Sequence, residues 1–370
     1  MNDNKISKNS IVAKFAVPIS FLILFFLAAN FTDCDLVTFW KRRSHLTDLV
    51  VDMIPPDFSY IQKILLPLFY TIQMSVTGTV LGIFFALVLS PFGAANLGFP
   101  AVIRRILRIV IQILRSFPAL ILALTATFLF GLGTFAGTFA ITLYTFAIMT
   151  KLTYEDASAA DVKAYQALRA MGVSKYVAYI HGILPEIIPG FLTNALYLLE
   201  TNVRHSSILG YVGAGGIGLL LNEKISWLEY DKVGTILLML FLTVCVIEYF
   251  SRYLAALIRK EHTIKKEQAR LLLLFLAALF LICTFTLSLP DFSKTSPQTL
   301  RNMFAGFLQP DWSFFFSAEK DGLGYLLLET VCIAFIGTVI GAIVSAPLAF
   351  LNTKRFVPAP VSFLFNLVIM

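Results

Sequence analysis

A short run of polar residues, Glu200-Thr-Asn202-Val-Arg204, stands inside an otherwise apolar stretch of the chain. A charged side chain within or near a membrane span is costly, so such a residue is a functional candidate. The guanidinium of Arg204, together with Asn202, suits bidentate contact with an oxyanion. Glu200 and Arg204 also lie four residues apart on one helical face, and a second interpretation is that they only neutralise each other.

A glycine-rich segment follows and contains Gly213, Gly215, Gly216 and Gly218. Its Gly-x-Gly-x-x-Gly spacing superficially fits a dinucleotide-binding fingerprint, but no βαβ unit surrounds it, so we reject that interpretation. Because glycine permits sharp backbone bends, we expect a flexible, closely packed external gate. The sequence contains no Gly-x-x-x-x-Gly-Lys-Ser/Thr loop, so we expect no ATP site in this chain.

The composition indicates which environment surrounds these residues. The chain has 370 residues, of which 58% are hydrophobic and 14% charged, and its mean hydropathy is +0.81. Soluble domains carry about a quarter charged residues, so the sequence predicts an all-α integral membrane protein and excludes disordered and disulfide-scaffold classes. The net charge of +7 does not indicate nucleic-acid binding, because the basic residues gather beside apolar segments. The scattered Cys and His residues predict no metal site.

Apolar segments long enough for membrane helices recur along the chain, since a span needs about 20 apolar residues. We predict them at 16–31, 64–90, 109–130, 134–150, 187–209, 233–258, 271–289 and 323–350, with a shorter one at 361–370. The basic residues near positions 5–14, 104–108, 151–175, 259–270 and 354–355 then fall on one side of the membrane. They predict a cytoplasmic N-terminus, and the first segment is expected to be a retained helix rather than a signal peptide.

The chain also contains an internal repeat. Thr71, Gly78, Thr79, Val80 and Gly82 recur as the same residue types 259 positions later, at Thr330, Gly337, Thr338, Val339 and Gly341. We therefore predict a first unit of six helices at 1–258 and an incomplete second unit of about three helices at 259–370, in which the second copy stops before its own polar loop. Parallel repeats of this kind are related by an axis along the membrane normal.

The main polar stretch on the predicted cytoplasmic side of the first unit covers about 151–186. Good helix formers precede Gly172, which is placed to end a helix in a left-handed conformation, and Ser174 can cap the next helix. Pro185 marks the entry to the following span. The pattern predicts two short helices lying across the inner surface.

In this loop, Gln166-Ala167-Leu168-Arg-Ala-Met-Gly172, followed by Leu184-Pro185, resembles the EAA motif of ABC importer permeases. The resemblance implies a coupling helix that seats in a groove of a cytoplasmic ATPase and transmits its motion to the spans. Gln166 replaces the usual Glu, and Gly182 replaces the usual apolar residue before Leu-Pro. The implied contact with the ATPase is therefore one of shape rather than charge.

The stretch from Asn202 to Gly218 resembles the phosphonate-type branch of these permeases, and the likeness extends over the first unit. Arg115-Ser-Phe-Pro118 similarly resembles the family's Arg-x-x-Pro element. The resemblance implies a type I ABC importer transmembrane domain, a permease for phosphonates or related oxyanions such as phosphite. Two alternatives stay open: a permease for another cargo such as methionine, and an ion-driven secondary transporter, which would need coupling acids buried in its spans.

The resemblance also implies partners. These are a cytoplasmic ABC ATPase dimer that binds ATP and magnesium, an extracytoplasmic phosphonate-binding protein, and a second permease unit or chain. We expect a multi-pass protein of the bacterial cytoplasmic membrane in contact with lipid. The chain itself is expected to hold no cofactor and to catalyse no reaction.

Overall fold

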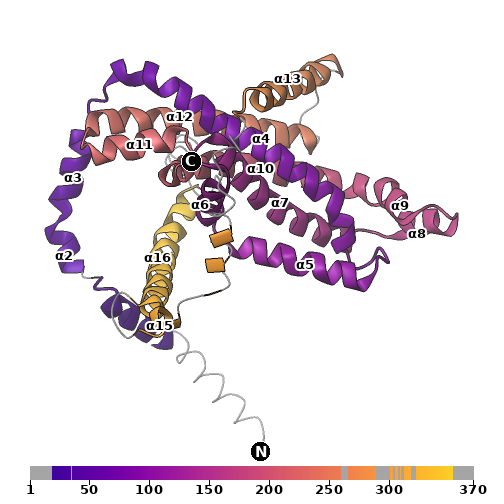
Figure 1. The fold of residues 1–370 in the computed structure, drawn as a ribbon, viewed down its shortest axis with the longest axis horizontal. Helices are drawn as coiled ribbons and strands as arrows, with labels where there is room; N and C mark the ends of the chain where they lie inside the picture. The colour runs from indigo at the N-terminus through magenta and orange to yellow at the C-terminus, as the bar shows by residue number, and fades with distance from the viewer. Residues whose placement is uncertain are drawn as a thin grey trace, which may run out of the picture. The chain divides into compact units, whose positions relative to one another are not determined.

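The structure is a computed structural model that describes residues 19–34, 36–259, 266–288, 301–302, 305–306, 309, 312–317 and 322–352. Every regular element within these ranges is a helix, as the sequence predicts (Figure 1). The chain forms two compact units, Leu49–Met303 and the pair Met1–Asp48 with Phe304–Met370. The repeat boundary between residues 258 and 259 concerns sequence similarity and stays a prediction.

The larger unit contains most of the helices. In chain order they are η1 (Phe58–Tyr60), α4 (Ile61–Gly93), α5 (Ala101–Ser116), α6 (Ala119–Phe130), α7 (Thr134–Ala159), α8 (Lys163–Ala170), α9 (Lys175–Gly182), α10 (Leu184–Leu209), η2 (Gly210–Val212), α11 (Ile217–Ser226), α12 (Tyr230–Ile258) and α13 (Lys266–Phe285). Over the described residues of both units, four helices are long and apolar enough to cross a membrane, or up to six if each of two bent helix pairs is one span.

The span predicted at 109–130 is not one straight helix. It consists of α5 and α6, whose axes differ by 95°. Phe117 adopts an extended conformation with φ −84° and ψ 125°, and Pro118 then caps α6. The physical reason is that proline disfavours helical geometry in the residue before it. The bend turns α5 away from α6 so that α5 packs along α7 (Figure 1).

Helices α4 and α7 form the central pair of this unit, and glycine permits their close approach. A Cβ atom built on Gly78 would lie 2.8 Å from Cβ of Ile141, and one on Gly82 would lie 2.7 Å from Cβ of Thr145. Small residues spaced four apart are a common device for packing membrane helices, because they bring two backbones together. The repeat motif of the first unit is therefore a packing motif.

Helix α13 is fastened to α4 by a buried amide. Gln73 has no exposed surface, and its Nε2 donates to the carbonyl oxygen of Cys283 at 3.0 Å and to Oγ1 of Thr286 at 2.8 Å. In apolar surroundings an amide N–H that is hydrogen-bonded is strongly preferred over one that is not. This contact places α13 within the larger unit.

The smaller unit contains the apolar helix Ile19–Phe31, α2 (Leu36–Lys41), α15 (Trp312–Phe315) and α16 (Leu323–Asn352), while α3 (Arg43–Asp52) crosses the division. Phe21 packs on Phe335 with ring centroids 5.1 Å apart, and Phe31 packs on Tyr325 at 4.9 Å. The predicted segment 361–370 and the basic residues 354–355 lie outside the described residues.

Candidate functional site

The predicted polar loop forms the α8–α9 hairpin. Helix α8 ends before Gly172, which adopts φ +83°, a left-handed conformation that favours glycine. Ser174 then caps α9, its Oγ accepting a hydrogen bond from the backbone N–H of Val177 at 3.4 Å. The two short helices predicted from the sequence are thus confirmed.

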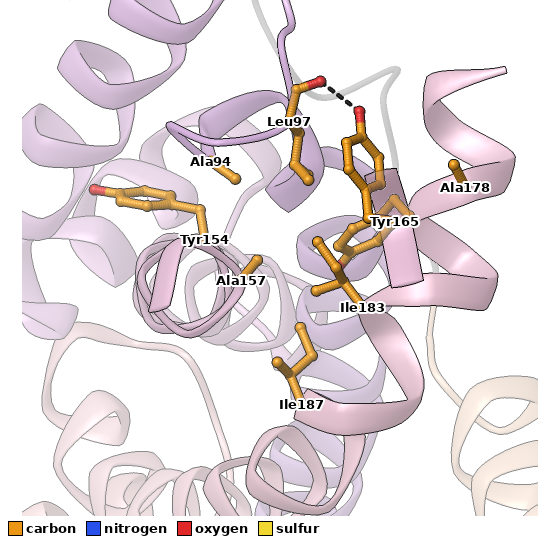
Figure 2. Packing of buried hydrophobic residues seen from close by; sticks show 9 residues of the cluster. Ala94, Leu97, Tyr154, Ala157, Tyr165, Ala178, Ile183 and Ile187 are labelled. Atoms are coloured by element: carbon orange, nitrogen blue, oxygen red, sulfur yellow. Dashed lines mark hydrogen bonds between the residues drawn. The ribbon is translucent and has the colours of Figure 1, made fainter. Parts of the chain in front are cut away.

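A buried cluster attaches this hairpin to the ends of α4, α7 and α10 (Figure 2). The hydroxyl of Tyr165 donates to the carbonyl oxygen of Leu97 at 2.6 Å, which ties α8 to the loop after α4. Burial raises the pKa of Tyr165, so its hydroxyl remains a donor at neutral pH. The other buried members are Ala94, Tyr154, Ala157, Ala178, Tyr179, Ile183 and Ile187. The hairpin is therefore packed firmly on the spans that it connects.

The packing of the hairpin explains why glycine stands at position 182, where the family pattern has an apolar residue. A Cβ atom at this position would lie 2.8 Å from the backbone nitrogen of Tyr165 and 2.9 Å from its Cα. Real Cβ atoms do not approach backbone so closely, and glycine allows α8 and α9 to touch. The unusual residue therefore accompanies a tightly closed hairpin.

The predicted motif residues divide between a surface and a core. Gln166, Ala167 and Gly172 are exposed, whereas Leu168 and Leu184 pack partly against the buried cluster. Pro185 is exposed in the first turn of α10. We call the exposed side of α8 the α8 face; it consists of Lys163, Ala164, Gln166, Ala167, Ala170 and Met171.

Two residues of the hairpin were missed by the sequence analysis. Tyr165 supplies the hydrogen bond to Leu97, and Met171 is an apolar side chain with 70% of its surface exposed. The tyrosine could have been found as one of the two large apolar residues, with Leu168, on one face of a short amphipathic helix. The exposure of Met171 depends on the turn at Gly172, which only the folded hairpin reveals.

The polar run near the end of α10 separates into two environments. The guanidinium of Arg204 forms an ion pair with the carboxylate of Glu200, and the two side chains are 48% and 13% exposed. This is the neutralising pair that the spacing allows. Arg204 nevertheless keeps about half of its side-chain surface free for another contact.

Asn202 has no exposed surface and joins three helices. Its Nδ2 donates to Oγ1 of Thr79 on α4 and to Oγ1 of Thr145 on α7, each at 2.8 Å. One turn along α10, the hydroxyls of Ser206 and Ser75 are 2.5 Å apart. Asn202 therefore lies in the interior of the unit, whereas Arg204 lies on its surface.

The glycine-rich segment is a packed turn between α10 and α11. Gly213 and Gly216 adopt φ +84° and +72°, and the carbonyl of Gly213 accepts from the N–H of Gly133 at 3.0 Å. The N–H of Ile217 donates to Oγ1 of Thr71 at 2.8 Å. A Cβ atom on Gly218 would overlap the carbonyl oxygen of Ser207. The predicted close packing is observed, and the gating role stays a prediction.

The far end of α11 is fixed by a charged cluster. Nζ of Lys224 lies 3.0 Å from Glu223 and 2.9 Å from Glu229, and 4.2 Å from the ring centroid of Trp227. Burial alone would lower the pKa of Lys224, but hydrogen bonds to Glu229 and Glu223 outweigh it and raise this pKa above its ordinary value. Lys224 is thus a structural cation that holds α11 against the start of α12.

The part of the chain that the structure describes contains no group of three or more His, Cys, Asp and Glu residues that could hold a metal ion. The candidate site has two parts. One is the exposed α8 face, and the other is the buried polar junction around Asn202, with Arg204 on the surface beside it.

Comparison with known proteins relates this arrangement to transporters. Residues 78–260 match the family model described as binding-protein-dependent transport system inner membrane component. The chain is 31% identical over 217 residues to the phosphite transport system permease protein PtxC of Stutzerimonas stutzeri, a match that covers 59% of this chain and 79% of that protein.

A second relative from the same organism is the putative phosphite transport system permease protein HtxC, 31% identical over 242 residues, or 65% of this chain and 86% of that protein. Among solved structures, the MetNI methionine ABC transporter in an inward-facing conformation matches with 20% identity and a TM-score of 0.49, covering 55% of this chain and 99% of that chain. The family match covers the α8–α9 hairpin, the polar run and the glycine-rich turn. The chain thus belongs to the inner membrane components of binding-protein-dependent transport systems, the multi-pass permease subunits of ABC importers.

Proposed function

We propose that this chain is the permease subunit of an importer for phosphonates or related phosphorus oxyanions such as phosphite, and that the α8 face is its contact with the partner ATPase. The observation that carries the proposal is the division of the hairpin into a buried cluster and an exposed face that includes three alanines. Small side chains permit close seating of a partner, while the buried cluster joins the hairpin rigidly to α4, α7 and α10. A push on this helix is therefore passed to the spans.

The energy for transport comes from the partner. An ATPase dimer binds ATP and magnesium, closes on nucleotide, and moves the hairpin, which switches the pathway between outward and inward access. The chain supplies the pathway and no catalytic group. A second permease unit or chain completes the assembly, and an extracytoplasmic binding protein delivers the cargo to the side opposite the hairpin.

The cargo assignment is supported by the relatives and by Arg204. Both relatives described above are named for phosphite transport. Arg204 keeps an exposed guanidinium near the predicted external end of α10, and this group binds phosphorus oxyanions well. The N-terminus and the hairpin lie on the cytoplasmic side of the bacterial inner membrane in this proposal.

The test is uptake of labelled methylphosphonate by cells in which the gene is deleted, and by the same cells carrying the gene on a plasmid. Unlabelled phosphite, phosphate and methionine are added as competitors to the parent strain. We expect uptake to be lost on deletion and restored by the plasmid, with phosphite competing more strongly than methionine.

Competition by methionine alone would contradict the cargo assignment while leaving the permease assignment intact. Uptake that collapses when the membrane potential is dissipated but continues without ATP would contradict the ATP-driven mechanism and favour an ion-driven transporter.

A further inference from the structure

Helix α5 carries its polar side chains in a single stripe. At about 100° per residue, Arg104, Arg105, Arg108, Gln112 and Arg115 fall within roughly one third of the helix circumference. We call these five residues the basic stripe. The exposed apolar residues occupy a different arc and are Val102, Ile103, Ile106, Ile109, Val110 and Ile113.

The stripe runs from the hairpin end of the unit toward its middle. Helix α5 begins after the loop that follows α4 and runs back beside α7 (Figure 1). Arg108 is held near the inner end, where its Nε donates to the carbonyl of Gly93 at 3.0 Å and its guanidinium lies 5.0 Å from the ring centroid of Tyr154. Arg115 is exposed in the last turn of α5, about two turns beyond Arg108.

No carboxylate of the described residues forms an ion pair with the stripe. Helix α5 contains no acidic residue, and none of the ion pairs within the described ranges includes one of its arginines. In the same unit, Arg204 pairs with Glu200, and Arg252 pairs with Glu248. Arginine at membrane depth is costly unless it is paired or faces water. The exposed side chains of Gln112 and Arg115, both within the span predicted at 109–130, therefore point to a water-filled pathway.

The stripe ends close to the helix that contacts α10. Arg115 lies in the last turn of α5, and α6, which begins directly after the bend, contacts both α7 and α10. Arg115 thus lies at the turn from α5 to a helix that packs against α10. From Arg115 back to Arg105 the polar residues of the stripe are three or four positions apart, about one helical turn, so each can take over an anion from the one before.

We propose that the basic stripe binds the phosphorus oxyanion during its passage through the cytoplasmic half of the pathway, with Arg115 as the first contact. This inference rests on the proposed function, since it requires an anionic cargo. A guanidinium donates two parallel hydrogen bonds to such an oxyanion, and the hand-over along α5 keeps the anion paired after it leaves Arg204.

The test uses the complete importer, with its ATPase and binding protein, in proteoliposomes of phosphatidylcholine with or without phosphatidylglycerol. The initial rate of ATP-driven methylphosphonate uptake is measured at saturating loaded binding protein. We expect Arg115→Gln to lower this rate about tenfold, the loss of roughly one charged hydrogen bond, and Arg115→Lys to lower it less. Gln112→Glu should lower the rate more than Gln112→Lys, because only the carboxylate repels the anion. Lys151→Gln, which removes a cation paired with Glu155 on α7, is the matched control and should transport at the wild-type rate.

Wild-type rates for Arg115→Gln and Gln112→Glu would overturn the stripe assignment while leaving the proposed function in place. Equal losses in Gln112→Glu and Gln112→Lys would also overturn it, since a packing defect does not depend on the sign of the charge. Losses confined to vesicles with phosphatidylglycerol would assign the stripe to lipid head groups instead. Failure of the wild-type importer to take up methylphosphonate or phosphite would overturn the proposed function and the stripe assignment with it.

Discussion

Motif residues occur both in the α8–α9 hairpin and at the junction of α10 with the glycine-rich turn. Several are exposed in the hairpin, whereas several are buried at the junction. In the hairpin, Gln166 and Ala167 are exposed, and residues around them form the core. At the junction, Asn202 and Gly218 are themselves buried. A motif on the surface is suited to a partner, whereas a motif in the interior fixes how the helices of one chain pack.

The largest expected effect on folding is at the junction. Gly218→Ala places a Cβ atom against the carbonyl of Ser207, and neither backbone can yield easily. We expect the free energy of unfolding to fall by about 3 kcal/mol, seen as a lower thermal midpoint and a poorer yield in detergent. The control is Gly190→Ala on α10, where no atom lies within 4 Å of the added group. A midpoint for Gly218→Ala equal to that of the control would contradict the packed turn.

Asn202→Ala should have the next largest effect. It removes the hydrogen bonds to Thr79 and Thr145 that join α10 to α4 and α7. Interhelical hydrogen bonds in membranes contribute about 0.6 kcal/mol each, so we expect a loss of about 1 to 2 kcal/mol in thermal unfolding. The neighbouring Thr201→Ala, which loses only a bond to its own helix, is the control. Equal midpoints for the two variants would show that the junction does not depend on Asn202.

Tyr165→Phe tests how the hairpin is attached, because it removes a single heavy atom, the hydroxyl oxygen of Tyr165. The variant loses the hydrogen bond to Leu97, and we expect a stability loss of about 1 kcal/mol. Because α8 is then less firmly tied to α4, more ATP should be hydrolysed for each cargo molecule transported. Measuring uptake and ATP hydrolysis in the same proteoliposomes gives this ratio, and an unchanged ratio would mean that the bond does not transmit the motion.

The smallest expected effect is that of Gln166→Glu, which restores the residue usual in the family. The side chain is exposed, and exposed charges contribute little to stability. We expect the thermal midpoint to stay the same and transport to change by less than about twofold. A much larger gain in transport would show that charge, rather than shape, governs the contact with the ATPase.

The regular elements were largely predictable from sequence, because apolar length and turn residues determine them locally. The segments at 64–90, 187–209 and 233–258 became α4, α10 and α12 with small changes at their ends. The bend before Pro118 was missed because apolar content alone does not distinguish a straight span from a broken one. The helices α2 and α3 were missed because short helices carry no strong periodic signal.

The site was only partly predictable. Residue type and spacing indicated the Glu200–Arg204 pair correctly, because i and i+4 positions always meet on a helix. The burial of Asn202 depends on Thr79 and Thr145, which are 123 and 57 residues away in the chain, and no local pattern encodes such contacts. The basic stripe of α5 could have been found from its spacing, but Arg104, Arg105 and Arg108 were interpreted only as markers of topology and Arg115 only as part of an Arg-x-x-Pro element.

The central claim is that the α8 face contacts a partner, whereas the junction fixes the packing within the chain. ATP-driven methylphosphonate uptake by the Ala167→Trp importer tests this claim most directly. Trp adds bulk on the exposed side of α8, and Val102→Trp on the exposed apolar arc of α5 is the matched control. We expect both variants to have wild-type thermal midpoints, Val102→Trp to transport normally, and Ala167→Trp neither to bind the ATPase nor to transport. Normal transport by Ala167→Trp would contradict the assignment of the α8 face to the ATPase.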